Sequence, residues 1–204
     1  MFLKGKFLPL CSTLLMRIYQ YISNLVFLLF HFACTTVHAY RWLDGVDMDL
    51  SIIPTEIGLL TNLKEIDFDS TRTLLGGGTI PTEIGNCESI NFIHATSYSG
   101  PIPTELGQLV NVQEMMFKDG MLTGSVPSQI GQLTKLTTLS FKNNQLEGTL
   151  PSEVGKLQGL KILDLLGNHL VGSIPRGVCM SPGILIFHDC NINECECCEK
   201  CWKN

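Results

Sequence analysis

The sequence is poor in basic residues and has no site for N-glycosylation. It holds 14 Lys and Arg against 19 Asp and Glu, a formal net charge of −5. Lys4, Lys6 and Arg17 lie in the first 39 residues, which hold no acid, so 11 cations face 19 acids in the remainder. Phosphate binding requires a basic face, and this balance argues against a nucleic acid partner. No Asn-x-Ser/Thr acceptor occurs, so glycosylation at asparagine is not expected.

Long apolar runs are absent after residue 39, so no membrane-spanning segment is predicted there. Before it, apolar clusters at 7–16 and 22–34 flank Arg17, and Val37-His38-Ala39 supplies small residues at the usual offsets of a cleavage site. Residues 1–39 are therefore predicted to be a signal peptide or an uncleaved signal anchor. Both alternatives place the rest of the chain outside the cell. An extension of the gene model without a targeting role is the third alternative.

One short phrase recurs six times, with an apolar residue, a proline and, in five copies, a glycine at its sixth position. It occupies residues 53–58, 80–85, 102–107, 126–131, 150–155 and, in degenerate form, 174–179. The prolines are 27, 22, 24, 24 and 24 residues apart. A period in the twenties with apolar residues at fixed offsets is typical of a leucine-rich solenoid. Pairs such as Leu139 and Phe141 are two residues apart, which indicates short strands with one buried side.

The two most regular coils begin at Leu133 and Leu157 and carry Asn144 and Asn168 five residues after the first apolar strand residue. Over about residues 53–179 the chain resembles the plant-type leucine-rich repeat family, whose unit ends in L-x-G-x-I-P-x-x-I-G. The resemblance implies an α/β repeat solenoid, a curved horseshoe with short parallel strands on its concave face. Its convex side is expected to be rich in loops and 3-10 turns, with a second short strand near the Ile-Pro element. Known members are mostly extracellular recognition domains.

Several coils depart from the family pattern. Thr71 and Gly120 stand at the asparagine position of their coils, and the coil that begins at Cys87 lacks two residues. An asparagine ladder is therefore predicted only in the last two full coils. Trp42-Leu43-Asp44-Gly45-Val46 resembles part of the family's N-terminal cap, but no cysteine follows it before Cys87. The predicted organisation is a degenerate N-terminal cap at 40–52, about five 24-residue repeats at 53–178 and a cysteine-rich C-terminal cap at 179–204.

The nine cysteines divide unevenly along the chain. Cys87 takes the place of Leu133 and Leu157 in other coils, which predicts a small buried apolar residue. The last 26 residues hold six more, namely Cys179, Cys190, Cys195, Cys197, Cys198 and Cys201. In an exported chain this even number favours three disulfides, and the sequence does not determine which cysteines pair with each other. They would hold the tail, with Ile184, Leu185, Ile186 and Phe187 as a lid, against the last coil. The ending is similar to C-terminal caps in repeat proteins of unicellular algae.

The alternative for the tail is a metal site. Cys195, Cys197, Cys198 and Cys201 offer four thiolates within seven residues, and Zn²⁺ accepts four sulfur ligands. The cellular compartment decides between the two chemistries, since disulfides persist in oxidising surroundings. No metal is predicted for an exported chain.

Alternate side chains of the predicted strands are expected to point to the concave surface, where curved solenoids make extended contacts. The candidate ligand-binding residues are Glu65, Asp67, Asp69, Phe92, His94, Glu114, Met116, Lys118, Ser140, Lys142, Asp164 and Leu166. Aromatic and apolar residues among polar ones are typical of a protein interface. The alternative is that these are ordinary solvated positions.

Catalytic residues and cofactor sites are not predicted. Asp67 and Asp69 share one side of a strand, but on an open, wet surface that does not tune a carboxyl pKa. Residues 76–78 are three glycines without a following Lys-Ser/Thr pair, so they do not make a phosphate cradle. His188 precedes Cys190 in the capping tail, where a disulfide is expected. The chain is also too short to hold both this solenoid and a catalytic domain such as a kinase.

These observations favour a non-catalytic extracellular recognition module, secreted or membrane-anchored, that binds a protein, peptide or glycan. A membrane co-receptor is a possible second partner, and the oligomeric state is left open. One alternative is an intracellular scaffold with a thiolate metal-binding cap. Another is a truncated fragment of a larger receptor.

Overall fold

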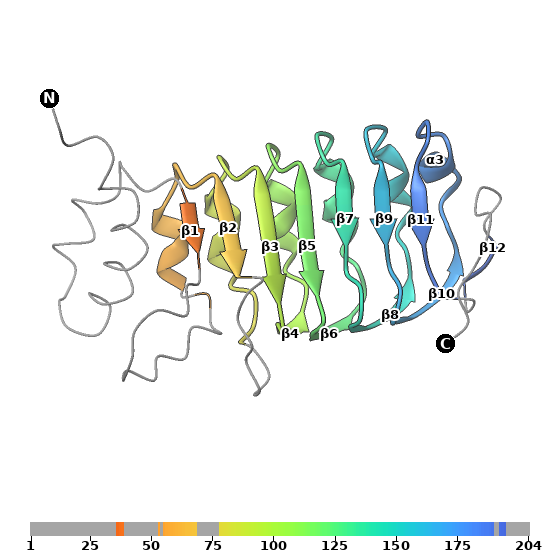
Figure 1. The fold of residues 1–204 in the computed structure, drawn as a ribbon, viewed down its shortest axis with the longest axis horizontal. Helices are drawn as coiled ribbons and strands as arrows, with labels where there is room; N and C mark the ends of the chain where they lie inside the picture. Colours follow the sequence, from red (N-terminus) through yellow and green to blue (C-terminus); the bar gives the residue numbers. More distant parts are fainter. Residues whose placement is uncertain (1–35, 39–52, 54, 69–77, 190–191, 195–204) are drawn as a thin grey trace, which may run out of the picture.

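The computed structural model describes residues 36–38, 53, 55–68, 78–189 and 192–194, which form one stack of coils (Figure 1). Each coil contributes one strand to a seven-stranded parallel sheet, in which neighbouring strands belong to consecutive coils. In sheet order these strands are β1 (Thr36–His38), β2 (Glu65–Phe68), β3 (Phe92–Thr96), β5 (Glu114–Lys118), β7 (Thr138–Ser140), β9 (Ile162–Asp164) and β11 (Leu185–Phe187). The predicted leucine-rich solenoid with parallel strands is confirmed.

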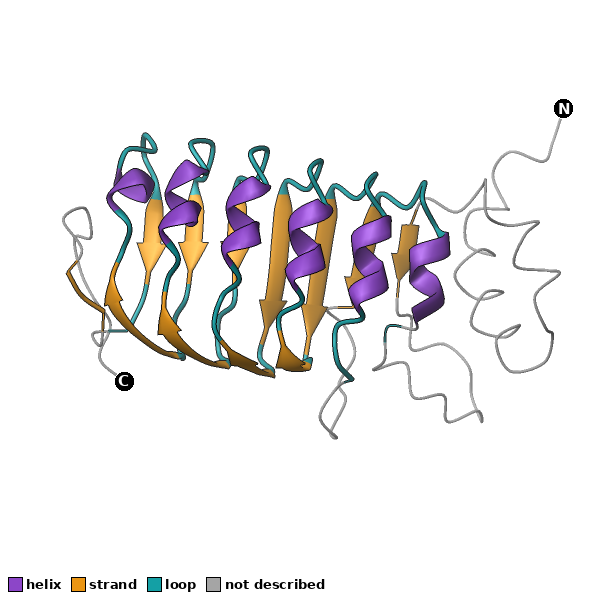
Figure 2. Ribbon diagram, turned by 180° about the vertical axis from the view of Figure 1, so that it is seen from behind, coloured by secondary structure: helices purple, strands orange, loops and turns teal. Residues whose placement is uncertain are grey.

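A second parallel sheet of five strands lies at the Ile-Pro side of the coils, as the family resemblance implies. In sheet order it contains β12 (Ile192–Glu194), β10 (His169–Ser173), β8 (Gln145–Thr149), β6 (Met121–Gly124) and β4 (Ser99–Pro101). The helices lie on the opposite side of the coils from the seven-stranded sheet (Figure 2). They are the 3-10 turns η1 (Thr55–Leu59), η2 (Thr82–Asn86), η3 (Thr104–Gln108), η4 (Ser128–Gln132) and η5 (Ser152–Lys156), and the α-helical turn α3 (Arg176–Cys179).

Strand β1 is a further strand of the sheet that lies before the first of the predicted repeats. Thr36, Val37 and His38 pair with Glu65, Ile66 and Asp67 of β2 in a parallel register. These three residues fall inside the segment 1–39 that was interpreted as an export signal. The boundary of that segment and the degenerate cap at 40–52, which lies outside the described residues, stay predictions.

The recurring proline and glycine have separate physical roles. Each proline of η2 to η5 stands just before its turn with φ between −72° and −65° and an extended ψ, which suits a residue whose ring fixes φ. The glycine lies where neighbouring coils touch. A Cβ added at Gly131 would lie 2.3 Å from the carbonyl oxygen of Glu153 in the next coil, and one at Gly107 would lie 2.6 Å from that of Gln129. The motif therefore sets the distance between coils on the helical side.

The core runs without interruption through the stack. Equivalent positions such as Leu136 and Leu160 are fully or almost fully buried, and Leu139 and Leu163 are completely buried. An aromatic row lies beside them, because the rings of Phe117 and Phe141 stack with centroids 6.5 Å apart. No single coil has enough apolar surface to form such a core alone, so each coil is stabilised by its neighbours.

The asparagine ladder is present where it was predicted, in the last two full coils. Asn144 Oδ1 accepts the backbone N–H of Leu122 at 3.0 Å, and its Nδ2 donates to the carbonyls of Phe117 and Phe141, both at 2.9 Å. Asn168 repeats this pattern one coil later, with its Oδ1 accepting from the N–H of Leu146. Each amide thus satisfies buried backbone groups of two coils. Leaving such groups without a hydrogen-bond partner would cost free energy of folding.

The ladder ends on a carboxylate that sequence reasoning missed. The backbone N–H of Asn144 donates to the carbonyl of Gly167 in the next coil. The equivalent N–H of Asn168 donates instead to Asp189 Oδ2, at 2.9 Å. A side chain therefore supplies the acceptor that a backbone carbonyl supplies one coil earlier.

Replacing Asn144 by alanine should destabilise the fold by about 2–4 kcal/mol, because the Leu122 N–H and two carbonyls lose their partner inside the core. Urea unfolding followed by circular dichroism measures the change. Asn111→Ala is the matched control, since that asparagine joins neighbouring coils through hydrogen bonds on the surface. We expect the control to cost less than about 1 kcal/mol. Equal losses in the two variants would contradict the role assigned to the buried ladder.

Candidate ligand-binding face

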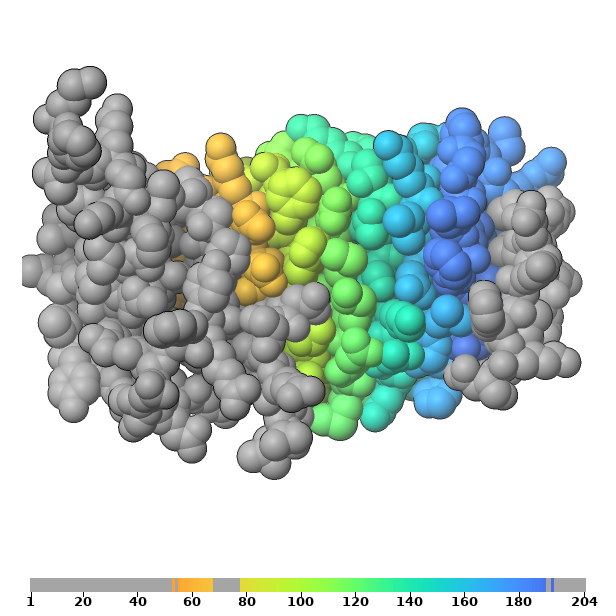
Figure 3. Space-filling model, in the orientation of Figure 1, coloured from red at the N-terminus to blue at the C-terminus, as the bar shows by residue number. Residues whose placement is uncertain are grey.

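The outward side of the seven-stranded sheet, called here the sheet face, is the surface on which the candidate residues were predicted (Figure 3). Burial alternates along β3 and β5, so every second side chain points outward. The strand register aligns these side chains in rows across the coils. One row contains Glu65, Phe92, Glu114, Thr138, Ile162 and Leu185, and the next contains Asp67, His94, Met116, Ser140, Asp164 and Phe187.

Most of the candidate residues lie on this face and are half-buried by their neighbours. Lys118, Lys142 and Leu166 follow the two rows at the next outward position of their coils. Ser140 differs from the expectation, because it is only 3% exposed and its Oγ accepts the backbone N–H of Lys142 at 3.4 Å. It serves the local turn and offers little surface to a ligand. Asp69 lies outside the described residues.

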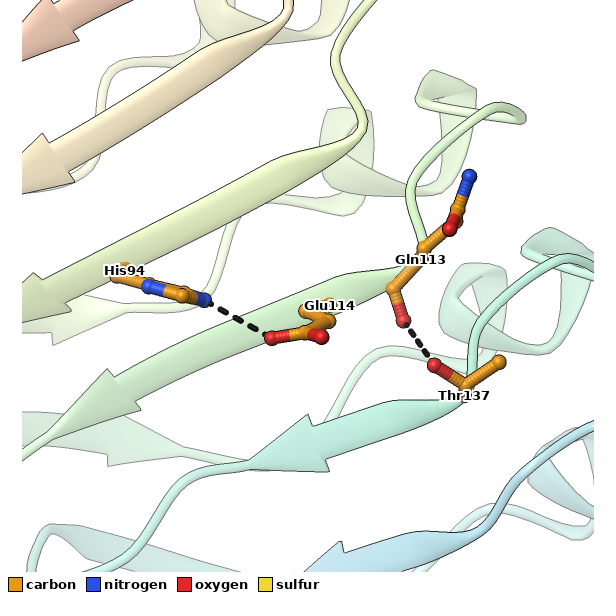
Figure 4. Close-up of polar contacts among 4 residues, drawn as sticks. All are labelled: His94, Gln113, Glu114 and Thr137. Atoms are coloured by element: carbon orange, nitrogen blue, oxygen red, sulfur yellow. Dashed lines mark hydrogen bonds and ion pairs between the residues drawn. The ribbon is translucent and has the colours of Figure 1, made fainter.

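His94 and Glu114 face each other across β3 and β5 near the middle of the sheet face (Figure 4). His94 Nε2 lies 3.2 Å from Glu114 Oε2, and their side chains are 28% and 36% exposed. An ion pair this open to water contributes little to stability, about 0–1 kcal/mol. In the same view the Thr137 hydroxyl donates to the Gln113 carbonyl, which joins the coils of β5 and β7 just before these two strands begin.

A shallow hollow of about 410 Å³ opens at the C-terminal end of the sheet face. Lys142, Asp164, Leu166 and Phe187 line it, so three successive coils contribute. Burial raises the pKa of the Asp164 carboxyl above its ordinary value, while the Leu166 N–H, at 3.3 Å, and the charges of Lys142 and Lys118 lower it. The Asp189 carboxylate raises it further. The hollow therefore combines two apolar side chains with a cation and a partly desolvated acid.

Leu185 and Phe187 belong to this face, contrary to the prediction that they form part of a lid. Strand β11 continues the sheet beyond the fifth coil, so its outward residues extend the two rows. Leu185 is 56% exposed, whereas Ile184 and Ile186 pack against the core. The two-residue spacing of Ile184 and Ile186 was the signal for a strand, but the pairing with β9 is needed to show which side faces outward.

The described cysteines differ in chemical state. Cys87 is a free, fully buried thiol whose Sγ lies 3.1 Å from the Ile57 carbonyl oxygen, as a hydrogen-bond donor. Burial raises the pKa of this thiol to about 11, so it stays protonated at neutral pH. The prediction of a buried residue in place of leucine is confirmed. Cys179 is disulfide-bonded. The other five tail cysteines lie outside the described residues.

Catalytic and metal sites find no support among the described residues. That part of the chain holds no group of three or more His, Cys, Asp or Glu able to bind a metal. His188 is 2% exposed and its Nδ1 lies 2.8 Å from the Asp189 carbonyl oxygen, so a substrate does not reach it. Among the described helices, none has the length and apolar character to cross a bilayer.

The raised pKa of Asp164 predicts how its charge affects stability. The folded state binds this proton more tightly than the unfolded state, so the group's contribution falls as pH rises above the ordinary aspartate pKa of 3.8. We expect Asp164→Asn to be more stable than the natural chain at pH 7, since the amide oxygen still accepts the Leu166 N–H. The difference should shrink toward pH 3. Thermal unfolding across this range measures it, and a constant difference would contradict the desolvation argument.

Comparisons with known proteins agree with this geometry. A family model described as Leucine Rich Repeat matches residues 135–157. A search of curated proteins finds no match. Among solved structures, the chain is similar to the plant peptide hormone receptor RGFR1 in complex with RGF2. The two share 32% identity over 70% of this chain and 22% of the receptor, with a TM-score of 0.61.

Two further structures show the range of proteins that share the fold. The ectodomain of the Arabidopsis receptor kinase HAESA, in complex with an IDA peptide hormone, is 27% identical over 68% of this chain and 24% of its own, with a TM-score of 0.56. A plant ice-binding protein is 26% identical over 68% of this chain and 44% of its own, with a TM-score of 0.58. The chain thus spans about a quarter or less of the two receptors. Repeat register, fold and these similarities together identify it as a plant-type leucine-rich repeat protein.

Proposed function

We propose that the chain is a non-catalytic extracellular recognition module that binds a protein, peptide or glycan ligand on the sheet face. The observation that supports this is the two registered rows of half-buried polar, aromatic and apolar side chains, which run across six coils. Such a surface offers many separate contacts to an extended ligand. Its mixture of Phe92, Met116 and Phe187 with charged residues has the composition of a protein interface.

The similar receptors favour a peptide among these ligand classes, because two of them are described in complex with peptide hormones. Fold likeness alone does not choose the ligand, since an ice-binding protein has the same architecture. A membrane co-receptor is included in the proposal as a second partner. Binding on a repeat surface produces a signal only when another domain or protein responds to it.

The proposal includes export and a disulfide-stapled tail. The predicted signal segment and the disulfide at Cys179 support it. In an oxidising compartment the six tail cysteines would form three disulfides and leave Cys87 as a buried thiol. A cytosolic scaffold would instead keep the tail cysteines reduced and available to Zn²⁺.

The intact mass of the chain secreted from a eukaryotic host, with and without thiol alkylation, tests this part. For a chain that begins at Tyr40 we expect three disulfides and one thiol that reacts only after unfolding, because burial holds the Cys87 pKa near 11. A mass that begins at Tyr40 would indicate a cleaved signal peptide, and full-length protein retained in membranes would indicate an anchor. Cytosolic protein with reduced cysteines and bound zinc would contradict the proposal.

Binding itself is tested with random peptides of about 12 residues on a display library, a length able to span the face, and with a glycan array. For any ligand found, reversing a sheet-face charge with Lys142→Glu or Glu114→Lys should change the dissociation constant about fivefold or more, as expected for close charge pairs. Lys156→Glu and Glu105→Lys are matched controls on the helical side. A ligand sensitive only to the control variants would place the binding site on the other side of the solenoid.

A further inference from the structure

The lysines of the sheet face lie beside the hollow at its C-terminal end. Among the described outward side chains, in the two rows and at the position that follows them, the Lys and Arg residues are Lys118 and Lys142. They occupy equivalent positions of neighbouring coils, and Lys142 lines the hollow itself. Positive charge on this face is therefore gathered at one place, although the whole chain has a formal net charge of −5.

The ammonium group of Lys142 is available to a ligand. Within the described part of the chain, the Lys142 side chain takes part in no hydrogen bond or ion pair. Its charge acts on the Asp164 carboxyl, but without direct contact. His94 and Glu114, by contrast, already contact each other. An ammonium carries three N–H donors, so Lys142 can bind an anionic group without first breaking a contact within the protein.

The other walls of the hollow favour an apolar group over a second anion. Leu166 and Phe187 line it from neighbouring coils, and the alkyl stem of Lys142 adds apolar surface. An apolar side chain that enters the hollow is removed from water by these walls. Asp164 also lines the hollow, so a carboxylate deep inside it would be repelled. An anion is therefore favoured only at the Lys142 side.

We infer, on the basis of the proposed function, that the ligand is a peptide that places an apolar side chain in the hollow and a neighbouring carboxylate on the Lys142 ammonium. The carboxylate belongs to an acidic side chain or to the carboxyl terminus of the peptide. From β7, which Lys142 follows, to β11, which carries Phe187, the sheet makes two steps, or about 10 Å. An extended residue covers about 3.3–3.6 Å, so the two groups lie at most about two positions apart.

Two display libraries of random peptides of about 12 residues, selected against the full secreted chain, test the inference. One library presents a free carboxyl terminus and the other a blocked one. Enriched sequences should pair Leu, Ile, Val, Met or Phe with a carboxylate within about two positions. Pairs enriched in both libraries would assign the carboxylate to Asp or Glu side chains. Pairs found only at the end of the free-terminus peptides would assign it to the carboxyl terminus.

Variants of the hollow separate the two parts of the inferred contact. Lys142→Gln should weaken binding of an enriched peptide about fivefold or more and remove the acidic preference, whereas Lys142→Arg should keep both. Leu166→Ala should weaken binding by a similar factor, remove the apolar preference and keep the acidic one. Asp164→Asn should strengthen binding about two- to fivefold, because the like charge beside the ligand carboxylate is removed.

Control variants distinguish failure of this inference from failure of the proposed function. Lys156→Gln on η5 is the matched charge control on the helical side and should leave binding unchanged. Phe187→Ala lines the same hollow and replaces Leu166→Ala if urea unfolding shows that variant to be unfolded. Peptides whose binding is lost with Glu114→Lys but survives Lys142→Gln, or that lack the paired preference, overturn the inference and leave the proposed function intact. If no peptide is enriched, the inference is overturned, and a glycan bound on the sheet face would still support the proposed function. Binding that is sensitive only to Lys156→Gln would overturn both.

Discussion

Contact between neighbouring coils is the constraint on which the rest of the molecule depends. A single coil exposes its apolar residues on both sides, so it gains stability only when another coil covers it. Strand pairing sets the separation on the sheet side, and the absence of a Cβ at glycines such as Gly131 allows the same close approach on the helical side. The ladder of Asn144 and Asn168 ties each bend to the coil before it. These three contacts together make the stack regular.

This regularity is also what makes the sheet face a candidate binding surface. Because consecutive coils hold their strands in register, outward residues that are more than 20 positions apart in the chain become neighbours in a row. Asp164 and Phe187 are neighbours of this kind, and His94 lies beside Glu114 of the adjacent row, 20 positions away in the chain. Because neighbouring strands of a sheet are evenly spaced, the length of an extended ligand would correspond to a number of coils. Rigid spacing of this kind suits the recognition role proposed for the sheet face.

The ends of the stack require special solutions, because the repeat supplies no neighbour there. At the C-terminal end Asp189 provides the acceptor for the Asn168 N–H that a backbone carbonyl provides one coil earlier. Strand β11 adds a further rung, so that Leu185 and Phe187 lie on the sheet face beyond the last regular repeat. The disulfide at Cys179 lies in the same region, next to the last Ile-Pro element. At the other end, β1 extends the sheet to residues 36–38.

The sequence by itself determined the solenoid, the strands within its regular repeats and the ladder at Asn144 and Asn168, because a repeated unit applies the same local pattern many times. It also predicted the outward positions from Glu65 to Leu166, since alternation within a strand follows from covalent geometry. Only the tertiary structure decided that Ser140 is buried, that His94 faces Glu114 and that Phe187 joins Lys142, Asp164 and Leu166 around one hollow. These features depend on pairing between different coils and on irregular end segments, where no repeat constrains the chain. Such pairings decide which side chains come together on the surface of a repeat protein, and local sequence patterns do not contain them.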